Sequence, residues 1–73
     1  MKHERISVDP KVLGGKPCIK GTRISVEHIL RELSAGLPPD ELLQAHPHIT
    51  REDILAAFGY AADSLSLEDI VLA

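Results

Sequence analysis

The sequence has little of what usually stabilises a small protein or anchors it in a membrane. Its 73 residues include one Cys, one Tyr, one Phe and no Trp. A single Cys excludes an internal disulfide, and a lone thiol fits a reducing compartment, so we expect a cytoplasmic protein. No apolar run approaches the roughly 18 residues of a membrane-spanning helix, and no apolar signal core follows the first residues. So short a chain buries little surface, so we expect a homodimer.

The net charge of −3 hides an asymmetry between the two parts of the chain. Residues 1–25 hold six Lys and Arg against two Asp and Glu, a net charge of +4. Residues 26–73 hold two against nine, a net charge of −7. This division indicates one face for an anionic partner and another for a cationic or apolar partner. The alternative is that acidic helices only keep the protein soluble.

Short β-structure is expected within residues 6–24. The first strand is short and alternating, and an Asp-Pro pair ends it. Lys20 and Gly21 form a two-residue turn candidate between two short apolar segments. Glycines and cations are concentrated in this region, which indicates a tightly shaped, basic surface segment. The alternative is a hairpin that only covers a small core.

Two short helices are expected next. Ser25 is a suitable N-cap for the first helix, and Gly36 stands where a glycine would end it. Pro39 suits the first turn of the second helix. That helix is expected to end by His46, because Pro47 biases the preceding residue away from helical backbone.

A third helix is expected to begin after Thr50, which forms a near capping box with Asp53. Gly59 costs roughly 1 kcal/mol relative to Ala in mid-helix, and we expect it to permit a close helix approach. Leu55 and Ala62 widen an apolar stripe, which is a further reason to expect a homodimer. The stripe comprises Ile54, Phe58, Ala61 and Leu65.

These patterns predict a mainly α protein that forms a single domain over residues 1–73. A small N-terminal β-ribbon with a basic hairpin occupies residues 6–24. A tri-helical, homeodomain-like helix-turn-helix domain follows over residues 25–62. Residues 63–73 form an acidic, apolar tail.

Three blocks of the sequence carry a resemblance to a known family. The first is Asp-Pro at residues 9–10 followed by Leu-Gly-Gly-Lys-Pro-Cys-Ile-Lys-Gly-Thr-Arg-Ile at residues 13–24, and the others cover residues 35–43 and 46–54. From about residue 6 to residue 62, the chain resembles the bacterial family called domain of unknown function 433. The resemblance implies a VapB-like antitoxin, a small helix-turn-helix module encoded beside a PIN-like ribonuclease toxin.

Five residues are candidates for DNA binding. In the helix-turn-helix interpretation, the N-terminus of the third helix enters the major groove with Thr50 and Arg51. Arg51 suits a phosphate or a guanine edge, but the acidic residues that follow it would repel phosphates. The better phosphate contacts are the hairpin cations Lys16, Lys20 and Arg23.

The C-terminal tail is the candidate partner-binding segment. Its mixture of acidic and apolar side chains suits a groove with a basic rim, such as the RNA-binding surface of a nuclease. The alternatives are a last short helix that covers the core, and a toxin contact made by the basic hairpin instead. The residues proposed for the partner are Leu67, Glu68, Asp69, Ile70 and Leu72.

No cofactor, metal site or catalytic activity is expected. His28, His46 and His48 lack the local spacing of metal ligands. Cys18 lies between two lysines, which would activate a thiol, but no acid or base accompanies it, so we interpret it as packed. A chain this small also leaves little room for a catalytic cleft.

The sequence therefore predicts a non-enzymatic binding module. By resemblance it is an antitoxin that neutralises a PIN-like ribonuclease and binds operator DNA. One alternative is a free-standing DNA-binding transcriptional regulator. Another is a protein-interaction adaptor without a nucleic-acid role.

Overall fold

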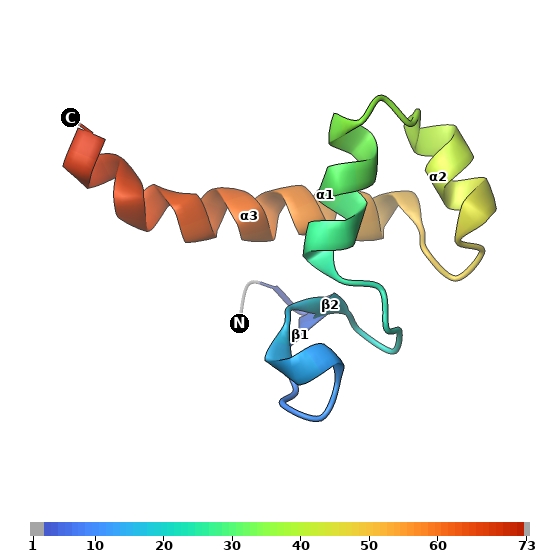
Figure 1. Cartoon of the computed structure of the whole chain (residues 1–73), viewed down its shortest axis with the longest axis horizontal. Helices are drawn as coiled ribbons and strands as arrows, with labels where there is room; N and C mark the ends of the chain where they lie inside the picture. The colour runs from blue at the N-terminus through green and yellow to red at the C-terminus, as the bar shows by residue number, and fades with distance from the viewer. Residues whose placement is uncertain (1–2, 73) are drawn as a thin grey trace.

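The chain folds into a small β-ribbon and three helices. The computed structural model describes the backbone of residues 3–72 and the side chains of residues 3–66. Figure 1 shows the ribbon on one side of the helices and the C-terminal half of the last helix projecting away from them. The elements are β1 (Ile6–Ser7), a 3-10 turn η1 (Leu13–Gly15), β2 (Cys18–Ile19), α1 (Val26–Ser34), α2 (Pro39–Ala45) and α3 (Arg51–Leu72). The predicted fold class, a β-ribbon followed by three helices, is confirmed.

The ribbon is built differently from a simple hairpin over residues 18–24. β2 pairs with β1 in an antiparallel arrangement. The Lys20-Gly21 turn forms as predicted, with the Thr22 N–H donating to the Ile19 carbonyl at 3.0 Å. Gly21 has a φ of +82°, which favours glycine. The residues after the turn form only an isolated bridge at Ser25, because the chain there enters the cap of α1.

The predicted ends of α1 are confirmed by their hydrogen bonds. The Ser25 hydroxyl accepts a bond from the His28 N–H at 2.9 Å. At the other end, Gly36 adopts a φ of +101°. The N–H groups of Gly36 and Leu37 both donate to carbonyls of the last turn at 3.1 Å, which is a Schellman motif. α2 ends before Pro47, as predicted.

The start of α3 is a complete capping box. The Thr50 N–H donates to Asp53 Oδ2 at 3.0 Å, and the Asp53 N–H donates to Thr50 Oγ1 at 3.2 Å. The buried Asp53 carboxylate also accepts a bond from Arg5 Nη1 at 3.1 Å. This ion pair joins the N-terminal segment to the third helix.

One hydrophobic core lies between the ribbon and the helices. α1 packs against both α2 and α3, and β1 packs against α3. Ile29 and Leu42 are fully buried at the centre. The buried cluster consists of Ile6, Ile19, Val26, Ile29, Leu42, Ile49, Ile54 and Ala57.

Only part of the apolar stripe of α3 packs into this core. Of the predicted stripe, Ile54 is buried, but Phe58 is 48% exposed and Leu65 is 59% exposed. Ala57 is fully buried instead, and Tyr60 packs against the core. Apolar residues occupy most of the circumference of α3, so the pattern alone did not distinguish its faces. Ala57 is small, so α1 can approach α3 closely on this side. The packing of the two helices decides which face of α3 is buried.

α3 sets the long dimension of the molecule. Its 22 residues span about 33 Å at a rise of about 1.5 Å per residue. Residues 63–72 continue this helix without a break. Beyond α1, the helix therefore extends away from the core (Figure 1). Within residues 3–72, no helix combines the length and apolar character needed to cross a membrane.

Candidate functional site

The structure divides the three hairpin cations between two places. Lys16 lies against α1, where its Nζ is 3.1 Å from Glu27 Oε1. Arg31 Nε also donates to Glu27, at 2.9 Å. Hydrogen bonds from Arg31 and from Lys16 hold the pKa of the Glu27 carboxyl below its usual range. Lys16 is therefore already engaged by a carboxylate, a contact that its position in the sequence did not reveal.

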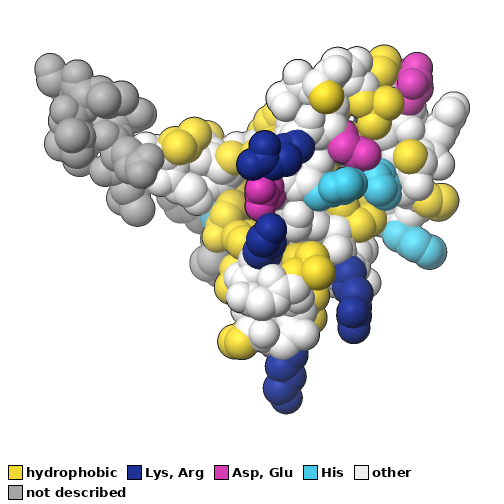
Figure 2. Space-filling view, viewed as in Figure 1, with side chains coloured by type: hydrophobic (Ala, Val, Ile, Leu, Met, Phe, Trp, Pro, Cys, Tyr) yellow, Lys and Arg dark blue, Asp and Glu magenta, His cyan; other side chains and the backbone are white. Residues whose placement is uncertain are grey.

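Lys20 and Arg23 lie together on the turn after β2. Thr22 shapes this turn, since its hydroxyl donates to the Ile19 carbonyl at 2.8 Å and accepts from the Ile24 N–H at 3.0 Å. Both cations are exposed, and neither forms an ion pair within the described part of the chain. Figure 2 shows Lys and Arg side chains dispersed over the face rather than gathered in one patch.

The turn faces the segment that links α2 to α3. Lys20 and Arg23 line a hollow of about 430 Å³ together with His48. His48 lies three residues before Arg51, the first residue of α3, so the two cations lie near the segment that links α2 to α3. Thr50 and Arg51, the other candidates for DNA contact, do not line this hollow.

At the N-terminus of α3, Thr50 and Arg51 are both exposed. The Arg51 guanidinium pairs with Asp40 at the start of α2. Glu41 and Glu52 are exposed on the same helices, which makes this surface acidic. A phosphate that approached Arg51 would have to compete with Asp40, so Lys20 and Arg23 are the more available cations.

A second feature is an apolar groove between α1 and α3, which we call the α1–α3 groove. It has a volume of about 470 Å³ and opens along the projecting part of α3. Glu27 and Arg31 stand at its α1 side. Its walls are mainly apolar and include Pro17, Val26, Leu30, Tyr60, Ala61 and Leu65, with Ser34 and Ser64 beside them. Sequence analysis missed it, because two helices distant in sequence contribute its walls.

A third feature is an exposed apolar seam on α3, which adjoins the α1–α3 groove at Leu65. Leu55 is 67% exposed, and Phe58 and Leu65 are also exposed. With the exposed Ala62, they follow one another at spacings of three, four and three residues. Gly59 lies beside this seam, and a Cβ added there would meet no atom within 4 Å. Gly59 makes no such close contact within the described residues, and the expectation of a close helix approach, including one across a dimer, stays a prediction.

The proposed partner-binding side chains, Leu67, Glu68, Asp69, Ile70 and Leu72, lie outside the described side chains. Their backbone belongs to α3, on the helix that forms one wall of the α1–α3 groove. The backbone of residues 67–72 and one wall of the groove therefore belong to the same helix.

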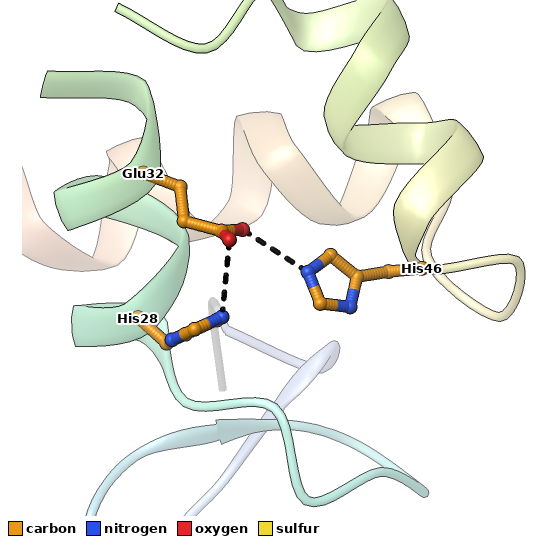
Figure 3. A group of neighbouring side chains, drawn as sticks. All are labelled: His28, Glu32 and His46. Carbon is orange, nitrogen blue, oxygen red and sulfur yellow. Dashed lines mark hydrogen bonds and ion pairs between the residues drawn. The ribbon is translucent and has the colours of Figure 1, made fainter. Parts of the chain in front are cut away.

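Three potential metal ligands come together between α1 and α2. Glu32 lies between the rings of His28 and His46, and Figure 3 shows both rings directed toward its carboxylate. His48 lies elsewhere, beside the Lys20 turn. Cys18 is buried and its thiol donates to the Lys16 carbonyl at 3.3 Å, as expected for a packed thiol.

Comparison with known proteins assigns the chain to a family. The family model described as "Protein of unknown function (DUF433)" matches residues 6–61. The chain belongs to the DUF433 family. A crystal structure of a DUF433 member protein from Anabaena variabilis ATCC 29413 superposes with a TM-score of 0.80 at 35% identity, covering 89% of this chain and 64% of that chain.

The chain is also similar to a curated protein that is longer than the chain itself. The "Uncharacterized protein y4eO" of Sinorhizobium fredii (strain NBRC 101917 / NGR234) is 34% identical over 58 residues, which are 80% of this chain and 26% of that protein. This DUF433 chain thus spans about a quarter of y4eO and less than two thirds of the Anabaena chain.

Proposed function

We propose that this DUF433 chain is an antitoxin-like binding module that neutralises a PIN-like ribonuclease. The observation that carries the proposal is the α1–α3 groove. Its apolar walls border the same helix that continues into the acidic and apolar tail. Exposed apolar surfaces of this kind are typical of protein-binding sites, and the family resemblance supplies the class of partner.

The two parts of this surface suit different features of a ribonuclease. Apolar side chains of the partner would fill the groove, where burial provides most of the binding free energy. The adjoining tail contains Glu68 and Asp69, and Asp63 precedes it on α3. Their carboxylates complement the cationic surface with which a nuclease holds RNA, so the bound helix competes with substrate.

The proposal predicts that Ser64→Arg strongly weakens neutralisation. Ser64 lines the groove and is exposed, so a long cationic side chain there obstructs the partner without disturbing the core. Loss of a well-packed contact of about 2 kcal/mol weakens binding on the order of 30-fold. The measurement is cleavage of a labelled RNA by a purified PIN-like ribonuclease from the same organism, titrated with parent or variant.

Ser66→Arg is the matched control, because Ser66 is exposed on α3 but does not line the groove. It should inhibit as well as the parent. Removal of residues 67–73 tests the tail separately from the groove. If the ribonuclease is inhibited equally by the parent and by Ser64→Arg, the groove is not the neutralising surface.

A second proposed role is operator binding, which the position of Lys20 and Arg23 beside the helix-turn-helix segment supports. Changing both residues to Ala should weaken DNA binding for all sequences. The slope of log K against log salt is negative, and each lost phosphate contact reduces its magnitude by about 0.9. The magnitude of the slope should therefore decrease by about 1.8 per protomer. Fluorescence anisotropy with promoter DNA at several salt concentrations measures this slope.

Lys16→Ala is the control for that experiment, because Glu27 already engages Lys16. It should change the slope much less than the double variant does. Equal effects of Lys16→Ala and the double variant would contradict the assignment of phosphate binding to the turn.

We also propose a homodimer formed through the α3 seam, defined by Leu55, Phe58, Ala62 and Leu65. Alternating spacings of three and four residues are the pattern by which helices pair along a common seam. A second copy presents the same seam, so the surface is complementary to itself. This arrangement covers Leu65, which the seam and the α1–α3 groove share, and leaves the rest of the groove open to a partner.

A further inference from the structure

We propose that His28, Glu32 and His46 form a binding site for a divalent transition-metal ion, with Zn²⁺ as the ion of best fit. One ligand atom from each side chain lies within 4.8 Å of the other two. His46 Nε2 is 3.0 Å from Glu32 Oε1, and His28 Nε2 is 3.5 Å from Glu32 Oε2. The three side chains come from two helices and converge on one point (Figure 3).

These separations agree with the coordination geometry of zinc. Zn–N and Zn–O bonds are about 2.0–2.1 Å long, so two ligand atoms on a tetrahedral ion are about 3.3–3.4 Å apart. The two distances lie on either side of that value and end on different oxygens of Glu32, so rotation of the carboxylate and of the imidazole rings would bring three ligand atoms around one ion. Two imidazole nitrogens and one carboxylate oxygen are a common zinc ligand set, and they leave a fourth position for water.

The backbone holds each ligand in place. His28 and Glu32 are four residues apart in α1, so they project from the same face of the helix. His46 is the C-cap of α2, where its N–H donates to the Leu42 carbonyl and its carbonyl accepts from the Ile49 N–H. Leu42 and Ile49 are core residues, so the position of His46 is tied to the packed interior.

Exposure of the cluster permits an ion to enter. The His28 side chain is 51% exposed, whereas those of Glu32 and His46 are 30% and 20% exposed. The rings of His28 and His46 meet edge to face with centroids 5.5 Å apart, so their nitrogens approach one point without stacking. Figure 2 shows histidine side chains gathered around an acidic one on this open face.

A bound ion would connect α1 to α2. α2 precedes the turn into α3, so the link would fix the orientation of the helix-turn-helix segment relative to α1. Ligand binding to the folded state alone raises stability in proportion to the logarithm of ligand concentration. The protein is therefore expected to unfold at a higher temperature in Zn²⁺ than in chelator.

The experiment is titration of the full chain with ZnCl₂ by isothermal calorimetry, together with thermal unfolding in ZnCl₂ and in EDTA. We expect one Zn²⁺ per chain and a higher unfolding temperature with the metal. Glu32→Gln, His28→Ala and His46→Ala should each weaken binding by more than the 10–100-fold that follows loss of an outer-shell partner. Glu32→Gln preserves the shape of the side chain, so weaker Zn²⁺ binding by this variant would reflect the lost charge and not a change in the fold of the site.

His48→Ala is the matched control, since His48 is exposed two residues from His46 but outside the cluster. It should bind Zn²⁺ as the parent does. Histidine ring ¹H–¹⁵N spectra provide a direct reading, with metal-dependent shifts expected for His28 and His46 and none for His48. The proposal is overturned if the parent binds no Zn²⁺, if Glu32→Gln and His46→Ala bind it unchanged, or if His48→Ala loses it.

Discussion

Leu42→Ala is expected to destabilise the protein by about 2–5 kcal/mol, the range for removing a fully buried leucine side chain. Leu42 lies in α2, is 0% exposed and belongs to the core cluster with Ile29. The loss includes both the transfer of the side chain out of water and the cavity that remains. It is the largest effect on stability that we expect from a single substitution.

The small size of the domain makes this loss severe. A stability of about 0.05–0.15 kcal/mol per residue gives about 4–11 kcal/mol for a chain of this length. Leu42→Ala therefore removes a large share of the total and should leave a measurable unfolded population. Urea denaturation followed by circular dichroism gives the free energy of unfolding for parent and variant.

Val8→Ala is the control, because Val8 is 58% exposed and lies outside the core. A surface substitution of this kind usually changes stability by no more than about 0.5 kcal/mol. If both variants unfold at the same urea concentration, Leu42 does not have the central packing role that its burial indicates.

The parts of the fold that the sequence predicted well are local ones. The caps at Ser25, Gly36 and Thr50 depend on residues within a few positions of each other, so their chemistry is visible without tertiary structure. The Lys20-Gly21 turn is local in the same sense. The helix ends and the turn therefore followed directly from residue types and spacings.

The parts that the sequence did not predict depend on which elements meet. Phe58 and Ala57 are neighbours on an apolar helix, and only the contact with α1 decides that Ala57 is buried. Lys16 and Glu27 are eleven residues apart, and their pairing depends on how the segment before β2 folds back on α1. Both cases required the tertiary arrangement.

The candidate metal site also depends on tertiary structure. The expectation of no metal site rested on the absence of local ligand spacing among His28, His46 and His48. In the structure, the third residue that joins His28 and His46 is Glu32 and not His48. Glu32 is four residues from His28 on α1 and fourteen from His46. Only His28 and Glu32 share a local spacing, whereas His46 belongs to another helix, so the complete cluster is visible only in the tertiary structure.

Phe58→Asp is expected to convert the proposed homodimer into monomers. Phe58 lies in the middle of the α3 seam between Leu55 and Ala62, and its side chain is 48% exposed in the single chain. A central aromatic residue of an interface contributes about 2 kcal/mol or more, and a symmetric dimer contains two copies. The dimer dissociation constant should therefore rise by about 10³-fold.

Sedimentation equilibrium over a range of protein concentrations measures this change. Because Phe58 does not belong to the core cluster, the helical circular dichroism signal of the monomer should remain close to that of the parent. Phe58→Leu should retain the dimer, since it preserves an apolar side chain in the seam. Ser64→Asp places the same charge on another face of α3 and should also leave the dimer intact. A parent that sediments as a monomer at high micromolar concentration, or a Phe58→Asp variant that remains dimeric, would show that the seam does not join two copies.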